Sequence, residues 1–186
     1  RYDVLSAFDD QFNYRLGITG QKGKVYGKIL YGTAYRVPSY REYLTVDAPN
    51  VELQPEHLKT LEVQMGYLVS KMDINVTLFN NSYDNFIQEI IVDSVLVDGA
   101  FVEIDDEMAF NFKSRNITGL ELNASFLPTK GLRIMTGASV LLHASEVLGS
   151  LDENVYTSQD LTFDENDLTF LSTVTGFLNT SYTFKK

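Results

Sequence analysis

The chain has 186 residues, enough for one domain with a sizeable core, and it contains neither cysteine nor tryptophan. Its 15 basic and 25 acidic side chains give a formal net charge of −10 without any basic cluster, which argues against nucleic acid as a partner. The lack of cysteine excludes a disulfide framework, a thiolate metal site and a cysteine nucleophile.

Alternation of apolar and polar residues predicts the strands, each with one apolar and one polar face. In 118–126, for example, Leu120 and Leu122 alternate with Glu121 and Asn123. In chain order, the pattern predicts strands over 12–20, 24–36, 60–69, 72–78, 118–126, 132–142 and, more loosely, 172–184. No apolar run approaches the roughly 18 residues of a transmembrane helix, but alternating strands escape hydropathy windows.

The connections between these strands alternate in length. Short turns are predicted at 21–23, 70–71 and 127–131, and long connections at about 37–57, 92–109 and 144–169. Short periplasmic turns and long external loops are typical of outer-membrane barrels, whose strands of about 9–11 residues span the bilayer at a tilt. The sequence therefore predicts an all-β fold, an antiparallel transmembrane β-barrel, here a partial barrel of about seven or eight meandering strands.

Aromatic residues are expected to gather at the two ends of the strands. The periplasmic ends carry Tyr67, Phe126, Tyr182 and Phe184, and the opposite ends carry Phe12, Tyr35, Phe110, Phe112 and Phe170. Two such bands match the interfacial girdles of a membrane barrel, whereas the alternative is that aromatic residues simply favour strands.

Residues 31–56, which read YGTAYRVPSYREYLTVDAPNVELQPE, resemble a stretch of the TonB-dependent outer-membrane receptors. The residues in this stretch that we single out as candidates are Tyr35, Arg36, Pro38, Tyr40, Glu42, Pro49, Asn50, Pro55 and Glu56. Val37 departs from the family pattern, in which alanine is usual. Upstream, residues 12–17 resemble a strand of the same family.

The resemblance implies a barrel of about 22 strands whose lumen is closed by an N-terminal plug. Residues 1–186 would then be a fragment of the C-terminal barrel domain, without the plug. The implied function is active import of a scarce nutrient, foremost a ferric siderophore, across the bacterial outer membrane. The implied partners are the TonB complex, acting through the missing plug, the iron–siderophore ligand and outer-membrane lipid.

The prolines of the family-like stretch have a physical rationale. Because proline fixes φ and cannot donate to a sheet, Pro38, Pro49 and Pro55 force the chain to leave the strand ladder. We expect Arg36 and Glu42 to pair across the base of this loop. The alternative is that the segment only shapes the barrel rim and binds nothing.

The polar strand faces are expected to line the lumen. Their members are Arg15, Lys28, Glu62, Gln64, Asp73, Asn75, Glu121, Asn123 and Arg133. Contact with the plug is the expected role, because a filled lumen must satisfy its charges; contact with one another or with water are the alternatives.

The sequence contains no catalytic or cofactor motif. It has no Ser-His-Asp spacing, phosphate-binding glycine loop or zinc motif, so we expect neither an enzyme nor a bound metal or cofactor. Haem receptors of the resembled family carry a histidine in the loop, but 37–53 contains none, and His57 and His143 are the only histidines. The acidic clusters at 105–107 and 160–167 are expected to be solvated loops rather than calcium sites.

Two other classes remain as alternatives, a lipocalin-like binding barrel and a passive porin. A lipocalin places its apolar residues inside and its polar residues outside, whereas a membrane barrel inverts this arrangement. A porin would differ by lacking the plug.

Overall fold

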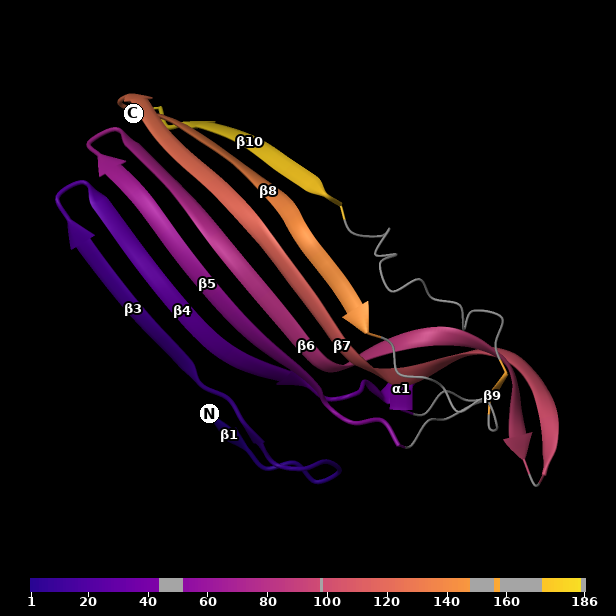
Figure 1. Cartoon of the computed structure of the whole chain (residues 1–186). Helices are drawn as coiled ribbons and strands as arrows, with labels where there is room; N and C mark the ends of the chain where they lie inside the picture. The colour runs from indigo at the N-terminus through magenta and orange to yellow at the C-terminus, as the bar shows by residue number, and fades with distance from the viewer. Residues whose placement is uncertain (44–51, 98, 148–155, 158–171, 185–186) are drawn as a thin grey trace.

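The computed structural model describes residues 1–43, 52–97, 99–147, 156–157 and 172–184 of the chain. Within these ranges, each long strand pairs antiparallel with the long strands next to it in sequence, which makes one curved sheet (Figure 1). In sheet order the strands are β3 (Arg15–Lys22), β4 (Val25–Arg36), β5 (Glu56–Val69), β6 (Met72–Val97), β7 (Ala100–Thr129), β8 (Leu132–Val147) and β10 (Val174–Tyr182). The predicted meander of a partial barrel is therefore confirmed.

Smaller elements accompany the sheet. Strands β1 (Tyr2–Asp3) and β2 (Gln11–Phe12) form a separate two-stranded ribbon ahead of β3. Helix α1 (Tyr40–Tyr43) lies between β4 and β5, and the short β9 (Tyr156–Thr157) pairs with β6. No helix in the described ranges is long and apolar enough to cross a bilayer.

The short turns lie close to their predicted places. Residues 70–71 form a turn as expected, but the first turn lies at 23–24 rather than 21–23. The reason is that Gly23, with a φ of 62°, supplies the positive φ of a tight hairpin, so the two residues before it still pair in the ladder. Gly131, with a φ of 93°, closes the third turn in the same way, and residues 127–129 belong to β7.

The expectation of a loop over 92–109 is wrong. Strands β6 and β7 remain paired up to Val97 and Ala100, and their hairpin extends well beyond the other strands before it bends (Figure 1). Asn85, with a positive φ of 54°, lies next to the point where β5 and β8 stop pairing with β6 and β7. Apolar residues fall on both faces of this hairpin, so the segment lacks the period-two pattern by which the other strands are predicted.

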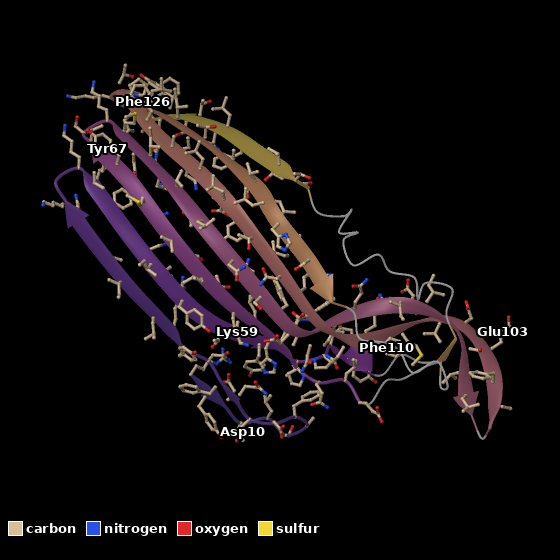
Figure 2. The ribbon with its side chains drawn as sticks, in the orientation of Figure 1. Asp10, Lys59, Tyr67, Glu103, Phe110 and Phe126 are labelled. Carbon is tan, nitrogen blue, oxygen red and sulfur yellow. The ribbon has the colours of Figure 1, made fainter. Side chains whose placement is uncertain are left out.

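The buried apolar side chains of the described chain gather in this hairpin and the loop beneath it. One cluster contains Phe86, Ile90, Val92, Met108 and Phe110, and a second contains Leu53, Ile87 and Ala109. Phe110 is 7% exposed and lies at the base of the hairpin (Figure 2), so its expected place in an interfacial girdle is wrong. It packs in a protein core instead.

The rest of the sheet is a single layer with two unlike faces. The cross-strand register puts apolar residues on one side, and most of them are exposed; Ile18, for example, is 76% exposed. We define the apolar face by Leu16, Ile18, Ile29, Leu61, Val63, Met65, Tyr67, Val76, Leu78, Leu122, Phe126 and Leu178. An exposed apolar surface of this extent marks a contact with a membrane or a partner.

Candidate functional site

The opposite side of the sheet, which we call the polar face, carries all nine polar residues singled out in the sequence. Register places them together: Lys28 pairs with Gln64, Gln64 with Thr77, and Thr77 with Glu121. In a neighbouring row, Asn75 pairs with Asn123 across β6 and β7. Arg15, Glu62, Asp73 and Arg133 lie on the same side by the same register.

Amide and ionic contacts link the centre of the polar face. The side-chain amide of Gln64 donates to Asn75 Oδ1 at 3.2 Å and to Thr77 Oγ1 at 3.1 Å. Lys28 Nζ lies 3.8 Å from Glu62 Oε2, and both side chains are about one-third exposed. These contacts run across strands rather than along them, so they fix side-chain positions on a surface that has no covering layer in the described chain.

Nearer the short turns, an aromatic ring covers a glycine. The hydroxyl of Tyr26 donates to Asp73 Oδ1 at 2.8 Å, and the ring lies directly over Gly66. A Cβ at Gly66 would collide with that ring, which explains why glycine occupies this point of β5. At the same end, Arg133 Nε donates to Ser125 Oγ at 3.3 Å.

Three of the nine residues have no side-chain partner within the part of the chain that the structure describes. These are Arg15, Glu121 and Asn123, none of which makes a described hydrogen bond or ion pair. The unpaired guanidinium of Arg15 and the unpaired carboxylate of Glu121 can each form an ion pair with an oppositely charged group of another domain or molecule.

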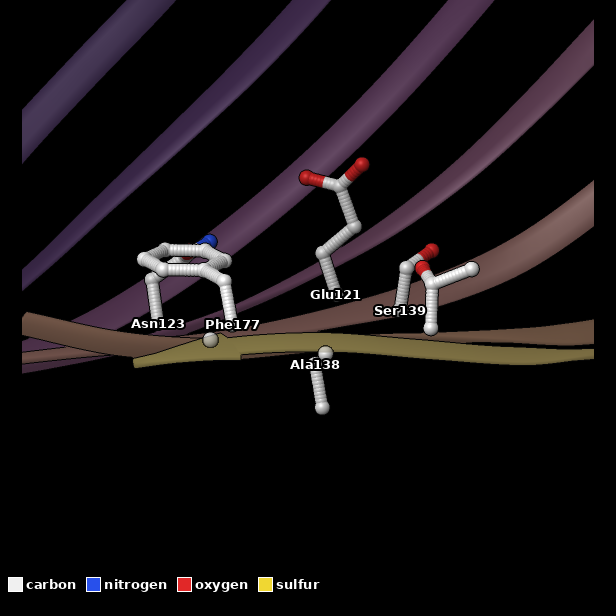
Figure 3. A pocket seen from close by; sticks show the side chains of 8 residues that line it. Glu121, Asn123, Ala138, Ser139 and Phe177 are labelled. Atoms are coloured by element: carbon white, nitrogen blue, oxygen red, sulfur yellow. The ribbon is translucent and has the colours of Figure 1, made fainter. Parts of the chain in front are cut away.

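Shallow hollows surround these unpaired groups. One hollow, of about 230 Å³, is lined by Glu121, Asn123, Ser139 and Phe177, which rise from one side of the sheet, while Ala138 points to the other (Figure 3). A second hollow of about 210 Å³ lies between Arg15 and Glu62. A third, of about 120 Å³, includes Asp73, Asn75 and Phe177 among its lining residues.

Phe177 and Gly137 belong to this site, although the sequence did not single them out. A Cβ at Gly137 would lie 2.7 Å from Asn123 Oδ1 and would meet the Phe177 ring. The loose alternation in 172–184 puts Phe177 on the other face of the strand from the apolar Leu178, and this was the one signal in the sequence for its place on the polar face.

The family-like loop closes the far end of the polar face. Arg36, the last residue of β4, places Nη1 2.9 Å from both carboxylate oxygens of Glu42 and Nη2 3.2 Å from Glu56 Oε2. The expected pairing of Arg36 with Glu42 is therefore present. Ser39 and Glu42 form a capping box at α1: Ser39 N donates to Glu42 Oε2 at 2.6 Å and Glu42 N to Ser39 Oγ at 3.2 Å.

Glu42 has a lowered pKa. Burial of the carboxyl group acts to raise its pKa, but the hydrogen bonds from Ser39 and the ion pair with Arg36 outweigh this effect. The carboxylate is thus held ionised at the base of the loop.

The remaining candidates in the loop differ in their surroundings. Pro38 and Pro55 are buried, Tyr40 is exposed, and Tyr35 pairs with His57 in the β4–β5 ladder. Pro49 and Asn50 lie outside the described residues.

A side-chain amide ties this loop to the long hairpin. Asn111 accepts from Gln54 N at 2.7 Å and donates back to Gln54 O at 2.9 Å and to Asn85 O at 2.8 Å. Glu56 Oε2 adds a bond from Ile87 N at 3.0 Å. Sequence reasoning missed Asn111, because no local pattern signals a contact between residues 57 positions apart.

The histidines and acidic clusters add no metal site in the described residues. Ring atom Nε2 of His57 lies 2.8 Å from Gln11 Oε1, and no described group of three or more His, Asp or Glu is placed to hold a metal ion. The cluster at 160–167 lies outside the described residues, as do the side chains at 105–106. The site is a wall with one polar and one apolar side.

Comparison with known proteins gives one family and several solved structures. The family described as "TonB dependent receptor-like, beta-barrel" matches residues 1–185. The ferric enterobactin receptor PfeA of Pseudomonas aeruginosa matches at 19% identity and a TM-score of 0.58, covering 74% of this chain and 22% of that one. The siderophore receptor PirA of the same organism matches at 18% identity and a TM-score of 0.60, covering 76% of this chain and 29% of that one.

An iron transporter from Neisseria meningitidis, FrpB, is also similar. Its identity is 17% and its TM-score 0.52, with 76% of this chain and 22% of that chain covered. The chain thus spans less than a third of the length of these structures. No curated protein sequence matches the chain. At these identities the likeness to solved structures establishes the fold.

Proposed function

Because the chain belongs to the TonB-dependent receptor-like β-barrel family, we propose that it forms part of the wall of an outer-membrane receptor that imports a ferric siderophore. Members of the family are outer-membrane receptors and transporters rather than enzymes. Import would be energised through the TonB complex. The names of PfeA and PirA support a siderophore as the ligand class.

The observation that carries the proposal is the division of the sheet into an apolar and a polar face. Exposed apolar side chains cover one face, whereas the amides, hydroxyls and charges lie on the other. A soluble barrel would bury its apolar face, but a membrane barrel turns it toward lipid and keeps the polar face inside. The family match argues against the lipocalin-like alternative.

We further propose that the polar face meets a plug in the full-length receptor. The unpaired Arg15 and Glu121 support this, since a filled lumen must satisfy its charges. The described sheet ends at β3 on one side and β10 on the other. Closure would therefore require further strands, in keeping with a chain that spans under a third of the solved receptors.

Cysteine labelling tests which face meets lipid, and the chain has no native cysteine to interfere. Ile18 and Thr19 are neighbours on opposite faces of β3, so Ile18→Cys and Thr19→Cys form a matched pair. In outer-membrane vesicles of the full-length protein, a water-soluble maleimide should label Thr19→Cys and leave Ile18→Cys unmodified until detergent is added. The reverse pattern would support a lipocalin-like barrel and refute the membrane wall.

Transport itself is tested with the full-length protein in Gram-negative cells that lack their own siderophore receptors. Uptake of ⁵⁵Fe supplied as ferric catecholate and ferric hydroxamate chelates should rise above the empty-vector level for at least one chelate. The rise should vanish in a tonB-null strain. Uptake that persists without TonB would indicate a passive porin, and no uptake of any ferric chelate would refute the siderophore assignment.

A further inference from the structure

Each described short turn of the sheet carries lysine. Lys22 precedes the first turn and Lys24 lies in it, Lys71 lies in the second turn and Lys130 in the third, and all four are exposed. None forms an ion pair with a carboxylate in the described chain. The sole described carboxylate near these turns is Asp73, which accepts from Tyr26 on the polar face.

The long hairpin at the opposite end of the sheet is rich in acidic residues. Residues 84–114, which include the long hairpin, contain eight Asp or Glu residues and one lysine. The chain is strongly acidic as a whole, so a turn end that carries cations almost alone is a departure from its average charge. At that end Arg41 and Lys59 pair with carboxylates, whereas the lysines of the short turns have no carboxylate partner in the described chain.

The backbone holds the lysine-bearing turns in a row. After each turn, the next strand beyond the hairpin donates one more N–H to a carbonyl of that turn. The bonds run from Leu68 N to Lys24 O at 2.7 Å, from Leu127 N to Lys71 O at 2.8 Å, and from Thr183 N to Gly131 O at 2.8 Å. Since adjacent strands lie about 4.8 Å apart, successive turns are spaced by about 10 Å along this rim.

Apolar and aromatic side chains lie directly beside the lysines. Tyr67 and Phe126 mark this end of the sheet in Figure 2, and with Tyr182 they are exposed on the apolar face. Tyr182 and Phe184 also contact each other edge to face, with ring centroids 4.7 Å apart. Amphipathic rings beneath a row of ammonium groups match the layered chemistry of a membrane interface, where lysine stems cover apolar surface and their charges reach the headgroups.

We propose that this belt, comprising Lys22, Lys24, Lys71, Lys130, Tyr67, Phe126 and Tyr182, binds anionic phospholipid headgroups of the leaflet that faces the periplasm. The inference rests on the proposed function, because it takes the apolar face to meet lipid. Phosphate is the complement of ammonium groups that have no carboxylate partner; Lys71 Nζ donates at 3.4 Å to the carbonyl of Pro128, which leaves its charge uncompensated. Each lysine close to an anionic membrane surface strengthens attachment by about fivefold, and salt weakens the attraction.

The test measures which lipids remain on the full-length protein. The protein is reconstituted in mixed micelles containing equal amounts of phosphatidylglycerol and phosphatidylcholine, separated by size exclusion, and its retained lipid is quantified. The wild type should retain phosphatidylglycerol several-fold over phosphatidylcholine at low salt and lose the preference at 1 M salt, where the Debye length is about 3 Å. The variant Lys24→Gln/Lys71→Gln/Lys130→Gln, with one change in each turn, should lose the preference at least fivefold.

A matched control removes three cations from the far end of the chain, as Arg1→Gln/Arg41→Gln/Lys59→Gln. It should keep the wild-type preference within about twofold, since net charge falls equally in both variants. If the turn variant and the wild type retain the same lipid ratio while both are folded, the belt is refuted and the receptor proposal stands. If the folded wild type retains neither lipid from the mixed micelles, the membrane placement fails and the inference falls with it.

Discussion

Replacing Leu178 by arginine should destabilise the barrel in a bilayer much more than the same change at the adjacent Asn179. Leu178 lies on the apolar face of β10 and is 72% exposed, so the substitution removes little contact with the protein. Asn179 lies on the polar face and makes no described hydrogen bond. The pair therefore isolates the contribution of the surroundings on each side of one strand.

The expected loss of stability follows from the depth of Leu178 in the bilayer. Leu178 lies four residues from Tyr182 at the turn end, which is about 13 Å along the strand at roughly 3.3 Å per residue. At a strand tilt of about 40°, this corresponds to about 10 Å of depth, close to the middle of the hydrocarbon layer. Arginine costs about 2–4 kcal/mol near the midplane, so Leu178→Arg should lower the free energy of unfolding by that amount. Asn179→Arg should change it by less than about 1 kcal/mol.

The assay is reversible urea unfolding of the full-length protein in phospholipid vesicles, followed by tyrosine fluorescence, because the described chain offers no tryptophan signal. Equal losses for the two variants, or a larger loss for Asn179→Arg, would refute the assignment of the apolar face to lipid. Repeating the measurement in thinner vesicles should reduce the cost of Leu178→Arg, since the arginine then lies nearer to an interface.

Three further outcomes follow from the rim and the polar face. Arg36→Ala should cost about 1 kcal/mol in urea unfolding, a modest value because its side chain is 45% exposed, and no loss would show that its two ion pairs are fully screened. Because folding lowers the pKa of Glu42, its contribution to stability is present above pH 4.5, the ordinary pKa, and is lost as the pH falls through the pKa of the folded state. Glu42→Gln should therefore reduce the dependence of the unfolding midpoint on pH in the acid range. Gly66→Ala should cost about 1–3 kcal/mol by displacing the ring of Tyr26, whereas Gly27→Ala, where the nearest atom is 3.6 Å from the new Cβ, should be nearly neutral; equal costs would contradict the packing argument.

The sheet was predictable from local alternation, and its errors have a common cause. Strands such as 132–142 repeat every two residues, so their faces follow directly from the sequence. The hairpin over 92–109 escaped because apolar residues fall on both of its faces, so the segment loses that period. The expected aromatic girdle failed at Phe110 because an aromatic residue in a local core gives the same sequence signal as one at a membrane interface.

The candidate site divides along similar lines. The pairing of Arg36 with Glu42 spans six residues and was predictable from Pro38, which takes the chain out of the strand between them. The amide exchange between Gln54 and Asn111 was not predictable, because it depends on how the long hairpin folds back over the loop. The ring of Phe177 over Gly137 likewise depends on the register of β8 and β10.

By itself, the sequence determined which residues share a face, where the short turns close and which family the chain resembles, because period-two alternation and turn glycines act within a few residues. Only the tertiary structure decided the register that gathers nine polar residues into one surface. It also decided the length of the β6–β7 hairpin, the partnerless state of Arg15 and Glu121 within the described residues, and the row of lysines at the short turns. Those features depend on contacts between residues far apart in sequence, and such contacts are set by the path of the whole sheet.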